Sequence, residues 1–393
     1  MATDRSETPS PAAIEGAARA VARFDAVMAL PGLRDLWWAF ALPDEAAALV
    51  RIQGGACSRT RLRLVAAGAQ VERPSPDDQA GVIVLRGVRA LYGWDGARPT
   101  ERRLNAFSTA MRRAGRRPAL PAAATATAIE TARAGEPSPL LAAARAVAGL
   151  RSAGADRAVL AGSAGSLLAA RGAAPQAALT LASGVFVPGE RGGDVLTSGP
   201  DAFLQAVGAA ADRHIGVLAD LLESRRTARA RIAAATQGAP HRQRGLRRDS
   251  GLLLSADALV GHEILTSSGL RAILARQGVP ATRRTAQRLL DGLVAAGVAK
   301  EATGRRHFRV WVPTDLPLAR LRADEAPRSA LEQEPRSAAG GAQSRPLSPA
   351  PAAHRPDRNA EAAWREIARS GDVLIRDIQR AIAEGRKATD DEG

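Results

Sequence analysis

Six neighbouring side chains could bind the edges of nucleic-acid bases or a phosphate backbone: Thr282, Arg283, Arg284, Thr285, Gln287 and Arg288. Thr282 is suited to an N-cap because its side-chain oxygen can accept a hydrogen bond from a backbone N–H of a helix's first turn. An arginine fork in that turn can bind guanine O6 and N7 or a phosphate, and Gln287 can pair with adenine. Thr285 and Arg288 are assigned to the DNA backbone. The spacing predicts a helix whose first turn enters the major groove of DNA.

The same segment carries an apolar pattern behind its polar tip. Leu289, Leu290, Leu293 and Val294 recur at the spacing of one helix face. One side of a helix over residues 282–296 is therefore expected to pack while the other stays open. Gly297 supplies the stop, because glycine readily adopts the left-handed conformation that ends a helix.

Two short strands are predicted after this helix, over residues 298–302 and 308–312. The turn between them holds Arg305, Arg306 and His307, which would contact phosphates, with Arg309 as a further candidate. Trp311 alternates with valines. It is expected to pack the strands against the helices rather than to stack on a base.

Two further helical patterns precede the cluster, over residues 255–263 and 267–277, and a turn over 278–281 leads into it. Together with the two strands they predict a winged helix-turn-helix over residues 255–313. The alternative is a winged helix that binds a protein partner. Against that alternative stands the cluster of cations, whose burial costs free energy unless a phosphate or carboxylate neutralises it.

The charge of the chain is concentrated near this segment. The formal net charge is +15, and residues 241–313 hold thirteen Lys and Arg against five Asp and Glu. A local excess of this kind suits double-stranded DNA as a partner, with binding that weakens as salt rises. A solvated basic surface is the alternative reading.

Other kinds of chemistry have little support in the sequence. Cys57 is the only cysteine, and the five histidines are scattered without the spacing of metal ligands, so neither a metal nor another cofactor is predicted. No segment sustains the roughly twenty apolar residues of a membrane span. We therefore expect no membrane association and a cytoplasmic, nucleoid-associated location.

Composition and breaks predict a mainly α protein. Alanine is abundant and aromatic residues make up only 3%, which favours close-packed helices over sheets. Within the helical part, a break is expected at Pro43, and residues 60–71 and 82–88 fit either strands or short helices. The predicted parts are a flexible lead over 1–12, a helical domain over 13–240, a basic linker over 241–254, the winged helix over 255–313, a disordered linker over 314–358 and an amphipathic helix over 359–386.

The last of these helices has two open interpretations. Its apolar residues fall on one face, so it either returns to the body of the protein or binds a protein partner. A homodimer is expected only from the habit of helix-turn-helix modules to bind paired half-sites.

Residues 155–175 resemble the segment around the active-site motif of Fic-type nucleotidyl transferases, which reads His-Pro-Phe-x-Asp/Glu-Gly-Asn-Gly-Arg-x-Gly-Arg-Leu-Leu in that family. The positions that match are Gly162, Gly165, Leu167 and Leu168. The order of the chain over about residues 30–313 is also similar to that of Fic-like helical proteins with a C-terminal helix-turn-helix. The resemblance implies a helical Fic-like domain in front of the winged helix.

The same resemblance implies that the family's chemistry is lost. Ala155 stands at the position of the general-base His, Val159 at that of the metal-holding acid and Ala161 at that of Asn, while Ser163 and Ser166 replace the phosphate-binding arginines. Without these groups phosphoryl transfer lacks its base and its charge neutralisation. An Ala-rich core helix with small residues for close packing would explain the segment equally well.

The resulting hypothesis is a DNA-binding protein, in function a transcriptional regulator, with a catalytically inactive helical domain and no enzymatic activity. The alternative is a divergent nucleotidyl transferase, or a toxin-antitoxin component, that its winged helix regulates. The discriminating feature is a His, an acid and an Arg on one loop, which residues 155–168 do not supply at the motif positions.

Overall fold

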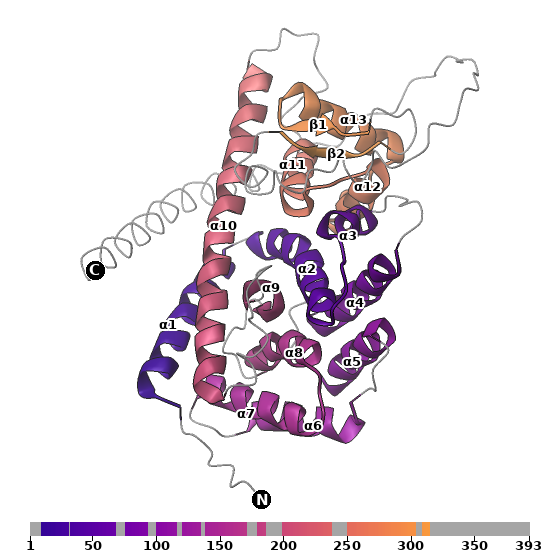
Figure 1. Cartoon of the computed structure of the whole chain (residues 1–393). Helices are drawn as coiled ribbons and strands as arrows, with labels where there is room; N and C mark the ends of the chain where they lie inside the picture. Colours follow the sequence, from indigo (N-terminus) through magenta and orange to yellow (C-terminus); the bar gives the residue numbers. More distant parts are fainter. Residues whose placement is uncertain are drawn as a thin grey trace, which may run out of the picture. The chain divides into compact units, whose positions relative to one another are not determined.

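The computed structural model describes residues 9–30, 32–67, 75–92, 100–115, 120–134, 138–170, 179–185, 199–237, 250–303 and 309–314. The chain divides into two compact units, residues 1–330 and 331–393, and every described residue belongs to the first. The described part is mainly helical, with thirteen helices and two short strands (Figure 1), so the prediction of a mainly α protein is confirmed.

The helices of the N-terminal part follow one another with short gaps. They are α1 (Pro11–Met28), α2 (Leu33–Ile52), α3 (Arg59–Ala66), α4 (Pro76–Tyr92), α5 (Glu101–Gly115), α6 (Ala122–Arg133), α7 (Pro139–Ser152), α8 (Arg157–Ala169), α9 (Leu181–Val185) and α10 (Pro200–Gln237). We refer to residues 9–237 as the body. Of the two segments that fit either strands or helices, residues 60–66 are helical in α3 and residues 82–88 are helical in α4, while residues 68–71 lie outside the described residues.

Helix α2 lies at the centre of the body and packs against α3, α4, α8, α9 and α11. Trp37, Trp38 and Phe40 are buried in it. The helix runs through Pro43 without ending, so the predicted break there is wrong. Proline removes one backbone hydrogen bond, at a cost of about 3 kcal/mol in a helix interior. Burial of α2 on nearly every face offsets that cost.

Helix α8, which covers most of the segment resembling the Fic motif, is buried along almost its whole length. A side chain at Gly162 would collide with the Phe107 ring, and one at Gly165 would collide with the carbonyl oxygen of Leu179. Glycines at these positions therefore allow neighbouring elements to approach α8 closely. This is what a core helix of small residues requires.

The C-terminal module, residues 250–314, contains α11 (Ser250–His262), α12 (Ser267–Arg276), α13 (Arg283–Ala295), β1 (Ala299–Glu301) and β2 (Trp311–Pro313). The strands are antiparallel, with Lys300 opposite Val312, and Leu265 forms an isolated bridge to Trp311. Trp311 is buried, as predicted. Both strands are shorter than predicted.

Two predicted boundaries differ from the structure. Helix α1 begins at Pro11, so residues 11 and 12 do not belong to a flexible lead; Ser10 caps the helix and proline is well placed in a first turn. Helix α11 begins at Ser250, so residues 250–254 are not linker; Leu252 is buried, which explains why the helix extends. The rest of the predicted basic linker lies outside the described residues. So do residues 315–358 and the predicted helix over 359–386.

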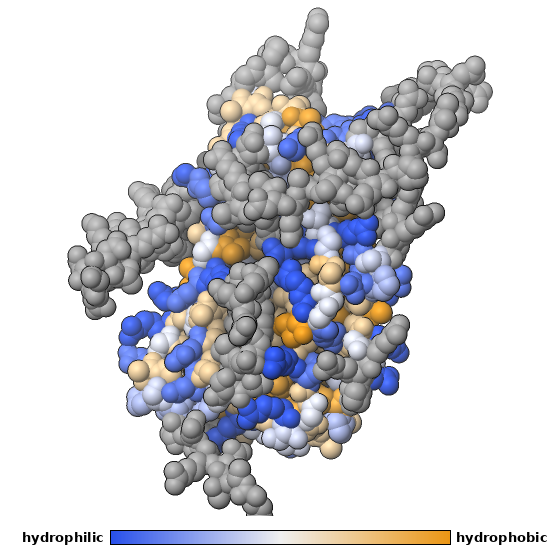
Figure 2. All heavy atoms as spheres, viewed as in Figure 1, coloured by the Kyte–Doolittle hydropathy of each residue, from blue (hydrophilic) through white to orange (hydrophobic). Residues whose placement is uncertain are grey.

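The surface is mixed in character. Figure 2 shows hydrophilic and hydrophobic residues interspersed over the described part of the face in view. Val294 is the one large apolar side chain that is exposed among the described residues. No helix in the described ranges is both long and apolar enough to cross a membrane.

Candidate nucleic-acid interface

Helix α13 begins as the sequence predicts. Thr282 is its N-cap, with extended backbone, and its Oγ1 accepts a hydrogen bond of 3.1 Å from the Thr285 backbone N–H. The two threonine hydroxyl oxygens lie 2.9 Å apart. Gly278, with a φ of 75°, ends the preceding helix and turns the chain toward this cap. The hydroxyl of Thr285 is therefore held at the cap.

One stripe of α13 is buried, as expected, but its members differ in part from the prediction. Ala286, Leu290 and Leu293 are buried, Leu289 is half-buried, and Val294 is 41% exposed. Val294 was expected in the packed face, and that expectation is wrong. It lies in the last turn of the helix, where only the stripe through Leu290 and Leu293 is covered.

The opposite side of α13 is open. The side chains of Thr282, Arg283, Arg284, Thr285 and Arg288 are exposed, and Gln287 is half-buried. Among the residues that the structure describes, none of the three arginines forms an ion pair with a carboxylate. We call Thr282, Arg283, Arg284, Thr285, Gln287 and Arg288 the α13 tip. The structure thus brings together the six predicted residues of this helix.

The predicted wing residues have a different outcome. Arg305, Arg306 and His307, between β1 and β2, lie outside the described residues. Arg309 lies 3.5 Å from Glu301 across the hairpin, measured from Nε to Oε2. That ion pair gives Arg309 a role within the hairpin, which differs from the predicted contact with phosphate.

Three arginines of helix α10 form hydrogen bonds with the C-terminal module. Arg225 donates two hydrogen bonds of 3.0 Å to the two Asp257 carboxylate oxygens on α11, and Arg229 adds two more, of 3.3 and 2.7 Å. Arg231 donates to the backbone carbonyl oxygens of Gly297 and Thr314, which lie before β1 and after β2. Bidentate arginine contacts fix orientation as well as distance. These residues were missed, although their close spacing on one helix was visible in the sequence.

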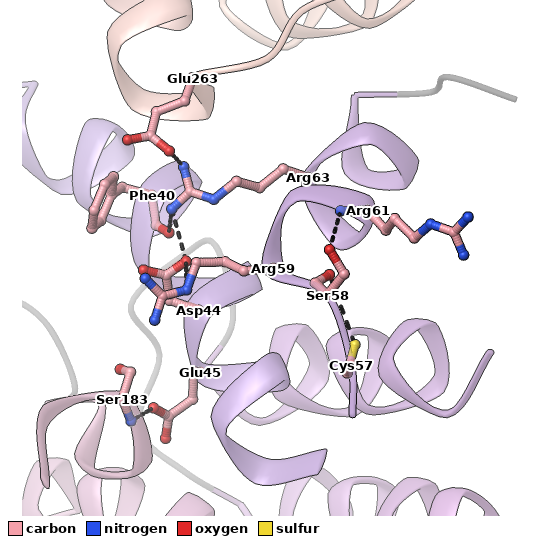
Figure 3. A network of polar contacts seen from close by, with 10 residues as sticks. All are labelled: Phe40, Asp44, Glu45, Cys57, Ser58, Arg59, Arg61, Arg63, Ser183 and Glu263. Carbon is pink, nitrogen blue, oxygen red and sulfur yellow. Dashed lines mark hydrogen bonds and ion pairs between the residues drawn. The ribbon is translucent and has the colours of Figure 1, made fainter. Parts of the chain in front are cut away.

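A second attachment is centred on Arg63 of α3, whose side chain is 3% exposed (Figure 3). Its Nη2 lies 2.7 Å from Asp44 Oδ1, and its Nη1 contacts the Glu263 carboxylate at the end of α11. The guanidinium carbon lies 4.8 Å from the centre of the Phe40 ring. Arg63 therefore joins α2, α3 and the module through buried charge.

The third attachment involves the first turn of α12. Thr266 caps this helix, accepting from the Gly269 N–H at 3.0 Å, and donates its hydroxyl to the Ala67 carbonyl oxygen at 2.6 Å. A side chain at Gly269 would collide with that same carbonyl. Together the three attachments hold the α13 tip in a fixed orientation relative to the body.

Several buried polar groups of the body form internal hydrogen bonds. Ser163 donates to the Val159 carbonyl oxygen at 2.6 Å within α8, and the Tyr92 hydroxyl donates to the Gly162 carbonyl oxygen at 2.9 Å. His214 Nε2 lies 2.7 Å from the Thr180 carbonyl oxygen, and burial lowers its pKa to about 4. None of these contacts places a nucleophile beside a base on an open surface.

Among the described residues, Glu45 is the one buried carboxyl whose pKa burial raises to about 7. It accepts hydrogen bonds from the backbone N–H groups of Ala182, at 3.1 Å, and Ser183, at 2.7 Å. Its carboxyl group therefore caps the N-terminus of α9. No group of three His, Cys, Asp or Glu side chains in the described ranges could hold a metal ion. Burial also raises the pKa of the Cys57 thiol to about 12, which keeps it protonated and unreactive.

No model of a known protein family matches the chain, and a search of curated protein sequences finds no significant match.

Proposed function

We propose that the C-terminal module is a winged helix-turn-helix that binds double-stranded DNA through the α13 tip, and that the protein regulates transcription. The observation that carries the proposal is the exposure of Arg283, Arg284 and Arg288 on one helix tip without a carboxylate partner among the described residues. Such a tip can place guanidinium forks against base edges and phosphates.

The rest of the module supports this reading. Three helices precede an antiparallel hairpin, and the buried stripe of α13 leaves its first turn open. Arg305, Arg306 and His307 lie between the two strands in sequence, so in a winged helix they would form the wing tip and contact phosphates. The attachments to α10 and α3 favour a pre-oriented helix, which lowers the entropy lost on binding.

The helical body is proposed to be catalytically inactive. The positions at which the Fic family carries its chemistry hold Ala155, Val159, Ala161, Ser163 and Ser166, and α8 buries the last four of them. The Ser163 hydroxyl is engaged by carbonyl groups of its own helix. The Fic-like ancestry, a homodimer, a protein partner of residues 359–386 and a nucleoid-associated location remain proposals of the same kind.

Salt dependence of DNA binding tests the proposal. We would titrate a fluorescent mixed-sequence duplex with the full-length protein and with an Arg283→Gln/Arg284→Gln variant across a series of salt concentrations. Each phosphate contact contributes about 0.9 to the slope of log K against log salt, so loss of two contacts should lower the slope by about 2. If the arginines contact bases instead, affinity for the preferred sequence falls by about tenfold or more for each.

The matched control is Arg112→Gln/Arg113→Gln, which removes the same charge from another pair of adjacent, exposed arginines, on α5. Unchanged binding in this control and loss in the α13 variant would support the proposal. Equal binding by the wild type and both variants, or no binding at low salt, would show that the module does not bind DNA through α13.

A further inference from the structure

The hairpin formed by β1 and β2 is too short to keep its shape alone. Each strand has three residues, and a single two-stranded hairpin is marginally stable in water. One edge of β2 is supported by Leu265, which exchanges backbone hydrogen bonds of 2.9 and 3.0 Å with Trp311. Near the turn, the Val310 N–H donates to Thr303 Oγ1 at 3.3 Å. The orientation of the hairpin therefore depends on contacts from outside its two strands.

Arg231 of α10 contacts the open end of this hairpin. Its Nη1 atom donates to the Gly297 carbonyl oxygen at 2.7 Å and to the Thr314 carbonyl oxygen at 2.9 Å. Gly297 lies between α13 and β1, and its left-handed φ of 67° directs the chain out of the helix. One cationic nitrogen thus joins the end of α13 to both arms of the hairpin.

The helix that supplies Arg231 belongs to the body. Helix α10 packs against α1, α7 and α9, and its arginines at 225 and 229 bind Asp257 of α11. Hydrogen bonds from a charged donor are about twice as strong as those between neutral groups. The orientation of the hairpin relative to α13 is therefore set in part by a helix that the C-terminal module does not contain.

We propose that Arg231 is a positioning residue for DNA binding, which orients the β1–β2 hairpin so that the cations between its strands meet DNA phosphates beside α13. This inference rests on the proposed function and adds that the body takes part in DNA binding through α10. Arg305 and Arg306 lie between the two strands in sequence. A hairpin that is already oriented loses less conformational entropy when such cations bind. Arg231 acts through the hairpin and does not itself bind DNA.

A double-mutant cycle separates this role from a direct contact with DNA. We would measure the affinity of the full-length protein for the mixed-sequence duplex at one salt concentration. The proteins are the wild type, Arg231→Gln, Arg305→Gln/Arg306→Gln and the variant that combines all three substitutions. Thermal unfolding without DNA gives the stability of each. Arg226→Gln is the matched control, because it removes one exposed arginine of α10 whose side chain lies 3.0 Å from Glu223 of the same helix.

Arg231→Gln should weaken DNA binding by about three- to tenfold, since the hairpin must then be ordered when DNA binds. In the background that lacks Arg305 and Arg306, the same substitution should change affinity by less than about twofold, because the cations that it positions are absent. Arg226→Gln should bind as the wild type does. Arg231→Lys keeps the charge on a shorter side chain and goes through the same cycle if Arg231→Gln does not fold. It should show a smaller loss, confined to the background that keeps Arg305 and Arg306.

An equal loss in both backgrounds would overturn the proposal, because Arg231 would then bind DNA itself or act on the module as a whole. Unchanged binding by Arg231→Gln, or by the variant that lacks Arg305 and Arg306, would overturn it as well. The α13 tip is judged separately by Arg283→Gln/Arg284→Gln. If that variant binds weakly while Arg231→Gln binds as the wild type does, only the positioning role fails. If every variant binds as the wild type does, both proposals fail.

Discussion

Helices α8 and α13 are both 13 residues long, and a side chain caps each in the same way. Asp156 accepts from the Val159 N–H at 2.9 Å, and Thr282 accepts from the Thr285 N–H at 3.1 Å. Beyond the cap they diverge. Helix α8 consists mostly of small residues and is buried on nearly all sides, whereas α13 buries one stripe and leaves its arginines exposed. The two helices begin with the same kind of side-chain N-cap. They differ in exposure, which determines which of them can contact a ligand.

The comparison predicts two separable classes of variant. Changes to buried groups of the body should cost stability and leave DNA affinity per folded molecule unchanged. Changes to the α13 tip should cost affinity and little stability.

The largest effect on stability is expected for Arg63→Ala. The substitution removes the guanidinium that pairs with both Asp44 and Glu263 in the interior, although Asp44 keeps its 3.5 Å contact with Arg59, and breaking a buried ion pair in this way costs about 3–5 kcal/mol. Urea unfolding followed by circular dichroism measures the loss. Arg19→Ala, which breaks the exposed pair with Glu15, should change the free energy of unfolding by less than about 0.5 kcal/mol. Equal effects of the two variants would contradict the assignment of Arg63 as a buried joint.

The pH dependence of stability should single out Glu45. Its pKa is about 7 in the folded protein against an ordinary 4.5, so the folded chain keeps a proton that the unfolded chain releases. The contribution of Glu45 to stability is therefore full below about pH 4.5 and declines as pH rises toward 7. His214 acts in the opposite direction, because its lowered pKa of about 4 costs stability as pH falls below 6.5.

Glu45→Gln should remove the pH-dependent contribution of Glu45 to the free energy of unfolding, which amounts to up to about 3 kcal/mol. The variant should gain stability relative to the wild type as pH rises from about 5 to about 8. Urea unfolding at several pH values measures this, with the exposed Glu15→Gln as the control. Parallel curves for wild type and Glu45→Gln would show that the carboxyl does not titrate in this range.

Gly165→Ala tests the close packing of α8. The added carbon would meet the Leu179 carbonyl, and overpacking of this kind costs about 1–3 kcal/mol, occasionally more. Gly149→Ala in α7 is the matched substitution, because nothing lies within 4 Å of the added carbon. There alanine should stabilise the helix by about 0.5–1 kcal/mol. If both variants are stabilised, α8 does not pack as described.

The smallest effect is expected at the α13 cap. Thr282→Ala should lower stability by about 1 kcal/mol, and Thr282→Ser should restore it, since serine keeps the acceptor oxygen. Thermal unfolding of the three proteins distinguishes them. Thr282→Ser behaving like Thr282→Ala would mean that the methyl group, not the cap hydrogen bond, stabilises this end of the helix.

The elements that could be predicted are those with local causes. The cap at Thr282, the stop at Gly297 and the packing of Trp311 follow from side-chain chemistry within a few residues, and all three are present. The break at Pro43 failed because packing from five other helices outweighs the local penalty. The contacts of Arg63 and Arg231 join residues far apart in sequence, and no local pattern marks which arginine will be buried.

The measurement that tests the central claim most directly is footprinting of genomic DNA with the purified full-length protein and the Arg283→Gln/Arg284→Gln variant. The account predicts discrete footprints for the wild type that are lost in the variant, while both proteins unfold at the same temperature because the two arginines are exposed. No footprint for the wild type, or identical footprints for both proteins, would contradict the assignment of the α13 tip as the DNA-reading surface.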